Sequence, residues 1–133
     1  MFRVALLAVM ALLACCSSPS VPEGITFPRY SATDHQPTAE IDARLIRVGS
    51  CLGLESGDVV YVALWPAAYG ASLSDTGRLV VTRDDRALAS EGADASFGGG
   101  EYSNARKDLV EDLVGQLPSG CEADGYWLVT GIQ

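Results

Sequence analysis

The pattern of apolar positions along this chain predicts strands separated by turn-forming residues. Its strongest strand pattern is residues 59–65, Val-Val-Tyr-Val-Ala-Leu-Trp, which is rich in β-branched and aromatic residues and is followed by Pro66. Because this run is apolar at odd and even positions alike, we expect a central strand with both faces buried. Weaker strand patterns lie at residues 43–48, 79–82, 87–90, 93–97 and 126–130.

One stretch follows instead the 3.6-residue period of an amphipathic helix. It covers residues 104–116, with Ser103 or Asn104 as the N-cap and with Pro118 and Gly120 beyond its end. We expect its apolar face to cover an open end of the β structure. The residues of this face are Leu109, Val110, Leu113, Val114 and Leu117.

Strand patterns near both ends of residues 41–133, with hairpins and one helix between them, describe a single domain that is mainly β (α+β). The expected fold is a small, partly closed antiparallel β-barrel or roll, and an OB-like topology is one such arrangement. A domain of this size buries only about 60 to 65% of the surface that its unfolded chain exposes. Its core is therefore thin, and a covalent cross-link would matter for stability.

The first residues have the pattern of an export signal. An apolar run at residues 4–14 follows Arg3, is shorter than the roughly 20 residues of a membrane span, and matches the core of a signal peptide. Leu12-Leu13-Ala14-Cys15 resembles the lipobox of bacterial lipoproteins. The resemblance implies cleavage before Cys15 and diacylglycerol on its sulfur, which would hold the domain on the extracytoplasmic side of a cell-envelope membrane. Two alternatives stay open, an ordinary secretory signal cut at another bond and a lipid on Cys16.

Three segments are expected from this reading. Residues 1–14 form the lipoprotein signal peptide, residues 15–40 a flexible tether rich in serine and proline, and residues 41–133 the globular domain. The only histidine, His35, lies in the tether, where we interpret it as a solvated polar residue and not as a base or ligand.

Cys51 and Cys121 are the two cysteines of the domain, and we expect them to form a disulfide. Neither they nor the adjacent Cys15 and Cys16 have the C-x-x-C spacing of a redox or zinc site. An envelope compartment permits the bond, which would close most of the domain into one loop and contribute about 4 kcal/mol on the chain-entropy model. Two separate buried thiols are the alternative.

Glycine, cysteine and aromatic residues lie at characteristic positions over most of residues 49–130. They are Gly49, Cys51, Leu52, Tyr61, Trp65, Pro66, Gly98-Gly99-Gly100-Glu101, Cys121 and Tyr126-Trp127-Leu128-Val129. This set resembles a family of small uncharacterised bacterial lipoprotein and secreted domains, although Ala67-Ala68-Tyr69 replaces a turn richer in proline and glycine. The resemblance implies the same disulfide pairing and a β-rich architecture, and it implies no activity.

Charge excludes one class of partner. The chain has 9 basic and 17 acidic residues and a formal net charge of −8 at pH 7. Such a surface repels the phosphates of nucleic acids, and no basic run or basic-aromatic strip offsets the repulsion. We therefore expect no nucleic-acid partner.

Candidate chemistry is weak throughout, and no catalytic, cofactor-binding or metal-binding residue is predicted. Residues 49–53 have the spacing of a nucleophile elbow around Cys51, but the domain is too short for that fold and has no histidine as base. Gly98-Gly99-Gly100 lacks the lysine of a phosphate loop and is interpreted as a turn. The acidic pairs are interpreted as solvated surface, and they are Asp84-Asp85, Glu111-Asp112 and Glu122/Asp124.

Five aromatic side chains could line a ligand groove, but packing in a thin core explains them better. They are Trp65, Tyr69, Tyr102, Tyr126 and Trp127. The sequence thus predicts a membrane-anchored envelope lipoprotein whose domain is a non-catalytic interaction or ligand-binding module. Its partners would be the membrane, through the lipid, and an envelope protein or small ligand. The alternative is a small envelope enzyme or metal-handling protein that uses carboxylates and hydroxyls.

Overall fold

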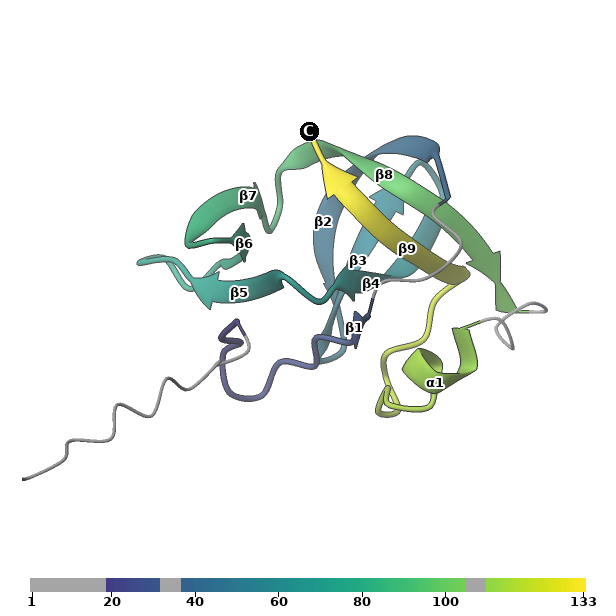
Figure 1. Ribbon diagram of the computed structural model, residues 1–133, viewed down its shortest axis with the longest axis horizontal. Helices are drawn as coiled ribbons and strands as arrows, with labels where there is room; N and C mark the ends of the chain where they lie inside the picture. The colour runs from purple at the N-terminus through teal and green to yellow at the C-terminus, as the bar shows by residue number, and fades with distance from the viewer. Residues whose placement is uncertain (1–18, 32–36, 105–109) are drawn as a thin grey trace, which may run out of the picture.

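The computed structural model describes residues 19–31, 37–104 and 110–133, which form nine strands and one short helix (Figure 1). The strands are β1 (Arg29–Tyr30), β2 (Ala39–Val48), β3 (Cys51–Ser56), β4 (Val59–Pro66), β5 (Tyr69–Leu73), β6 (Leu79–Arg83), β7 (Arg86–Ser90), β8 (Asp94–Ser103) and β9 (Gly125–Ile132). The helix is α1 (Glu111–Val114).

Five of these strands close into a barrel. They are hydrogen-bonded in the order β4-β3-β2-β8-β9, and β9 pairs back onto β4. The pairs are antiparallel except for β4 and β9, which run parallel. A three-strand meander, a fourth strand beside the first, and a fifth strand between the fourth and the third make up an OB-like arrangement. The predicted mainly β barrel is confirmed, and the barrel is fully closed.

β4 is buried along most of its length, as its sequence predicts. Tyr61, Ala63 and Trp65 belong to the larger core cluster, whereas Val62 and Leu64 belong to a second cluster that contains the two domain cysteines. All five side chains are at most 9% exposed. A strand that packs on both faces needs apolar residues at every position, which explains its unbroken apolar run.

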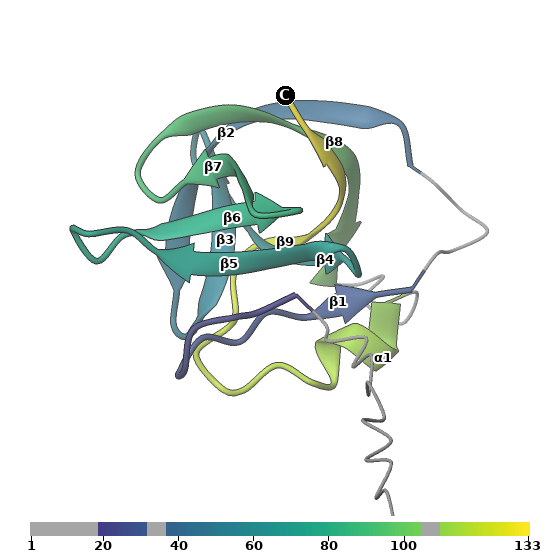
Figure 2. The same ribbon diagram turned by 60° about the vertical axis from the view of Figure 1, so that its left-hand side comes forward.

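The connection from β4 to β8 forms a second, three-stranded antiparallel sheet of β5, β6 and β7. Figure 2 shows this sheet in front of the barrel. Its residues Ala71, Leu79 and Val81 belong to the larger core cluster, so the sheet packs against the barrel. β6 and β7 join through Asp84 and Asp85, whose φ angles of 51° and 60° match a type I′ hairpin turn. The strand patterns at residues 79–82 and 87–90 thus correspond to the two strands of an antiparallel hairpin.

Gly98, Gly99 and Gly100 lie inside β8, so the predicted turn is wrong. They pair with β9, with a register shift between Gly98 and Gly99. Gly99 has a φ of 148°, and a Cβ on it would overlap the carbonyl oxygen of Leu128. A Cβ on Gly100 would lie 2.5 Å from Pro37 Cβ. Glycine is therefore required here because Leu128 and Pro37 lie too close for a side chain, and not because the backbone reverses its direction.

The helix covers less of the described chain than its sequence pattern predicts. Ser103, one expected N-cap, is the last residue of β8, because the β8–β9 ladder continues to the pair Ser103 and Gly125. Residues 105–109 of the expected helix lie outside the described residues. The N-cap of α1 is Val110, whose side chain makes no capping hydrogen bond. Within the described ranges, no helix is long and apolar enough to cross a membrane.

The apolar side of the expected helix is packed against the barrel where the structure describes it, but not at the expected place. Val110, Leu113, Val114 and Leu117 contact the second core cluster. Asn104, the other expected N-cap, donates instead from Nδ2 to the carbonyl oxygens of Ala123 and Asp124, at 3.3 and 3.2 Å. The segment around α1 thus covers the outer face of β4 and β9 rather than an open end of the barrel.

Residues 19–31, which we call the strap, pack against the domain although the sequence assigns them to the tether. β1 within the strap pairs in parallel with the end of β4. Phe27 is 9% exposed and joins the larger core cluster, with Val21 and Ile25 packed against that cluster. The described part of the expected tether is therefore continuous with the folded domain.

Candidate functional site

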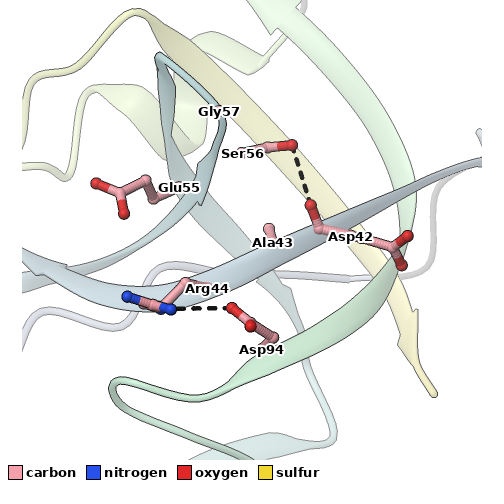
Figure 3. Close-up of a pocket in the computed structure, with 7 residues that line it drawn as sticks. All are labelled: Asp42, Ala43, Arg44, Glu55, Ser56, Gly57 and Asp94. Carbon is pink, nitrogen blue, oxygen red and sulfur yellow. Dashed lines mark hydrogen bonds and ion pairs between the residues drawn. The ribbon is translucent and has the colours of Figure 1, made fainter.

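A hollow of about 400 Å³ opens on the outer surface of the barrel (Figure 3). Three segments supply its walls, namely the middle of β2, the end of β3 with the following turn, and the first residue of β8. Its lining residues are Asp42, Ala43, Arg44, Glu55, Ser56, Gly57 and Asp94. Among them only Ala43 belongs to the core, so the hollow is a charged surface feature.

Strand register brings the charged side chains of the hollow together. Arg44 of β2 lies opposite Glu55 of β3 and opposite Asp94 of β8, so one cation stands between two carboxylates on flanking strands. Arg44 Nε is 3.4 Å from Asp94 Oδ1. The two side chains are 52% and 74% exposed, and water screens such a pair to between about 0 and 1 kcal/mol.

On the other side of the hollow, two serine hydroxyls donate hydrogen bonds to Asp42. Ser56 Oγ donates to the carbonyl oxygen of Asp42 at 3.0 Å. Ser96 Oγ donates to Asp42 Oδ1, which orients that carboxylate toward β8. Figure 3 shows the carboxylates of Asp42 and Glu55 pointing to opposite sides. They therefore do not converge on one point as an acid/base pair or a cation cage would require.

The acidic pairs considered from the sequence are not among the residues that line this hollow. Asp84-Asp85 forms the β6–β7 turn, and Glu111-Asp112 lies in α1. Asp124 accepts a hydrogen bond from the backbone N–H of Val60 at 2.9 Å. Among the described residues, no group of three histidine, cysteine or acidic side chains is placed to hold a metal ion.

The disulfide between Cys51 and Cys121 is formed, with 5.7 Å between the two Cα atoms. Both residues are buried, at 0 and 1% exposure, within the second core cluster. The bond joins the start of β3 to the loop before β9. The predicted pairing is confirmed and the alternative of two separate thiols is wrong. Cys15, Cys16 and His35 lie outside the described residues.

Ser50 connects the strap to the disulfide. The N–H of Thr26 donates to the carbonyl oxygen of Ser50 at 2.8 Å, and their hydroxyl oxygens lie 2.9 Å apart. Ser50 Oγ is also 3.6 Å from Cys121 Sγ. Gly49 beside it has a φ of 60°, and a Cβ there would lie 2.6 Å from the carbonyl oxygen of Gly120. The supposed nucleophile elbow is thus the tight turn that holds the cross-link.

Four of the five aromatic residues considered for a groove are buried, so packing explains them, while Tyr102 is half-buried. The buried four are Trp65, Tyr69, Tyr126 and Trp127, at 0 to 6% exposure. Trp127 Nε1 donates to the carbonyl oxygen of Gly98 at 3.4 Å. Trp65 Nε1 is buried and has no hydrogen-bond partner in the part of the chain that the structure describes.

The strap makes hydrogen bonds to the barrel that the sequence interpretation missed. Tyr30 OH donates to the carbonyl oxygen of Val129, and burial, with the nearby Tyr69 and Tyr102, raises the pKa of Tyr30 to about 12. Arg29 Nη1 donates to the carbonyl oxygens of Pro19 and Tyr69, at 2.9 and 3.3 Å. The signal was the pair of aromatic residues in Phe27-Pro28-Arg29-Tyr30, which is unusual for a solvated linker.

No protein-family model, no curated protein and no solved structure matches this chain.

Proposed function

We propose that this protein is a lipid-anchored envelope protein whose barrel is a binding module without a catalytic role. The single observation that carries the proposal is the buried Cys51–Cys121 disulfide, because such bonds persist in oxidising compartments outside the cytoplasm. An exported domain agrees with the signal-peptide pattern of residues 1–14. The lipobox resemblance then makes Cys15 the lipid-bearing residue.

The outer surface of the barrel favours a positively charged partner. Asp42, Glu55 and Asp94 line its hollow together with one cation, Arg44. Their carboxylates are exposed and do not converge, which suits reversible electrostatic contact with a basic peptide better than chemistry on a bound substrate. Contacts of this kind weaken as salt rises, because the charges are screened by solvent ions.

Metabolic labelling with palmitate tests the anchor. We expect the full chain to incorporate label and fractionate with membranes, Cys15→Ala to lose both properties, and the matched Cys16→Ala variant to retain them. Label that survives Cys15→Ala but disappears in Cys16→Ala would transfer the anchor to the neighbouring cysteine. Label that survives in both variants would contradict lipidation at this site.

Titration of the protein with a lysine-rich peptide, followed by NMR, tests the binding module. We expect salt-sensitive shifts in residues of the hollow and a weaker response from the double variant Asp42→Asn/Glu55→Gln. The matched double variant Glu111→Gln/Asp112→Asn, which removes two exposed carboxylates elsewhere, should leave the response unchanged. Equal weakening by the two double variants, which change the net charge by the same amount, would show that only net charge matters, and the hollow would not be the site.

A further inference from the structure

The strap ties the chain to the domain very near the expected lipid. The carbonyl oxygen of Pro19 accepts a hydrogen bond from Arg29 Nη1 at 2.9 Å, and the carbonyl oxygen of Ser20 accepts one from the N–H of Ala71 at 3.0 Å. Pro19 also packs against Gly70, since a Cβ on that glycine would lie 3.0 Å from Pro19 Cβ. The chain is thus held against β5 from residue 19 onward.

Only residues 16–18 separate Cys15 from this attachment. Four extended residues reach at most about 14 Å, whereas a free tether over residues 15–40 would reach roughly 85 Å. The lipid-bearing residue therefore cannot lie far from Pro19 and β5. A chain this short leaves the domain little freedom to rise from the bilayer or to roll on it.

The charged residues are distributed unevenly between the part of the domain next to this attachment and the rest. The strap and residues 69–90 together carry four arginines and four acidic residues and are electrically neutral: Arg29, Arg78, Arg83, Arg86, Glu23, Asp75, Asp84 and Asp85. The other described residues carry two arginines and eleven acidic residues: Arg44, Arg47, Glu40, Asp42, Glu55, Asp58, Glu91, Asp94, Glu101, Glu111, Asp112, Glu122 and Asp124. An anionic lipid surface repels the second group and not the first.

β5 also presents an exposed apolar side chain on the neutral side. Leu73 is 54% exposed and lies three residues from Gly70, about 10 Å along the strand. Val59 is the other large apolar residue described as exposed, at 37%. It begins β4, about 23 Å along that strand from Pro66, where β1 of the strap pairs. Val59 thus lies at the end of β4 away from the strap, whereas Leu73 lies on β5, the strand that the strap contacts.

We propose that the face formed by the strap and the β5–β6–β7 sheet lies against the lipid headgroups, with Leu73 in contact with them and the acidic barrel directed away. The proposal rests on the lipid anchor at Cys15. It assigns a fixed orientation to a domain that a long tether would have left free, and it leaves the hollow on the barrel open to a partner.

Photo-crosslinking of the full chain in bacterial membranes tests this orientation. p-Benzoylphenylalanine replaces Leu73 in one variant and Val59 in the matched control. We expect lipid adducts, detected by mass spectrometry, to be several-fold more abundant from position 73 than from position 59. Equal adducts from the two positions, or more from position 59, would overturn the proposed face.

Membrane flotation of the same samples separates this proposal from the anchor itself. Flotation that depends on Cys15, with no preference for position 73, leaves the anchor intact and rejects the orientation. Flotation that persists in Cys15→Ala rejects the anchor.

A third variant tests the short connection. Twelve glycine and serine residues inserted between Ser18 and Pro19 add roughly 20 Å of flexible reach. We expect the insertion to leave flotation unchanged and to lower the adducts at position 73 to the level seen at position 59. An unchanged preference for position 73 would show that the short connection does not orient the domain.

Discussion

The ring of Phe27 lies flat on the indole of Trp65, with 5.1 Å between the ring centroids and 4° between the ring planes. Tyr69 continues the cluster, with its ring centroid 6.4 Å from that of Trp65, and the guanidinium carbon of Arg29 lies 5.7 Å from the centre of the Phe27 ring. A strap residue thus stacks on a fully buried residue of the barrel. The strap is therefore part of the fold and not the flexible tether that the sequence predicts.

Loss of this stacking should destabilise the whole domain. Phe27→Ala is expected to lower the free energy of unfolding by about 3 to 5 kcal/mol, because it removes a buried aromatic ring and leaves a cavity beside Trp65. Urea unfolding of a secreted fragment, residues 17–133, measures the change. Leu73→Ala, which truncates an exposed side chain, should cost less than about 0.5 kcal/mol. A cost for Phe27→Ala no larger than this control would show that the strap does not stabilise the barrel.

Reduction of the disulfide should have a comparable effect. Cys51 and Cys121 are separated by 70 residues, so the bond is expected to contribute about 4 kcal/mol through the entropy of the unfolded chain. A reductant should lower the urea midpoint of the secreted fragment by the corresponding amount. The double variant Cys51→Ala/Cys121→Ala should have the low midpoint with or without reductant. A midpoint in the unaltered fragment that is insensitive to reductant would contradict this contribution.

Gly99 should tolerate no side chain. A Cβ at this position would overlap the carbonyl oxygen of Leu128, and the φ of 148° is itself unfavourable for other residues. We expect Gly99→Ala to cost about 3 kcal/mol or more of unfolding free energy. Gly131→Ala on the neighbouring strand is the matched control, because a Cβ there would meet nothing within 4 Å. Similar costs at the two positions would mean that strand propensity, and not close approach, determines the effect.

Glu91 should make stability depend on pH. Partial burial raises the pKa of its carboxyl group, but hydrogen bonds from the N–H of Leu79 and from Arg47 Nε, each at 3.0 Å, outweigh burial and lower the pKa below 4.5. A lowered pKa means that the folded state favours the ionised carboxylate. Its contribution to stability is therefore present above pH 4.5 and is lost as the pH falls through the lowered pKa.

Glu91→Gln tests this dependence. The variant is expected to be about 1 to 2 kcal/mol less stable than the unaltered fragment at pH 7, and the difference should shrink as the pH falls below 4.5. Urea unfolding at a series of pH values measures it. Glu122→Gln, which changes an exposed carboxylate, serves as control. A stability difference that stays constant from pH 7 to acid would contradict a role for the charge of Glu91.

Local patterns in the sequence were sufficient for several features of the fold. The unbroken apolar run at residues 59–65 predicted a strand buried on both sides, because burial on both faces leaves no position for a polar side chain. The positions of Cys51 and Cys121 near the two ends of the domain, together with the expected export, predicted their disulfide. Strand patterns with one short helical pattern predicted a small β-barrel.

The features that were missed depend on neighbours far away in the sequence. A run of three glycines favours a turn locally, but pairing with β9 and the approach of Leu128 and Pro37 make it the middle of a strand. Ser103 has the local chemistry of an N-cap, but the β8–β9 ladder uses it as a strand residue instead. Local propensity amounts to a fraction of a kcal/mol per residue and is overridden by such pairing.

The sequence by itself determined the class of the domain and its cross-link, because both depend on local pattern or composition, and the lipid at Cys15 stays a prediction from it. Only the tertiary structure decided where the domain begins. Proline and serine in residues 19–31 suggested a mobile tether, and the complement for Phe27 is a ring 38 positions later, at Trp65. The contact between the strap and the barrel forms only when residues far apart in the sequence meet in the folded chain. The strap, and the membrane-facing side that we propose from it, could therefore be found only from the tertiary structure.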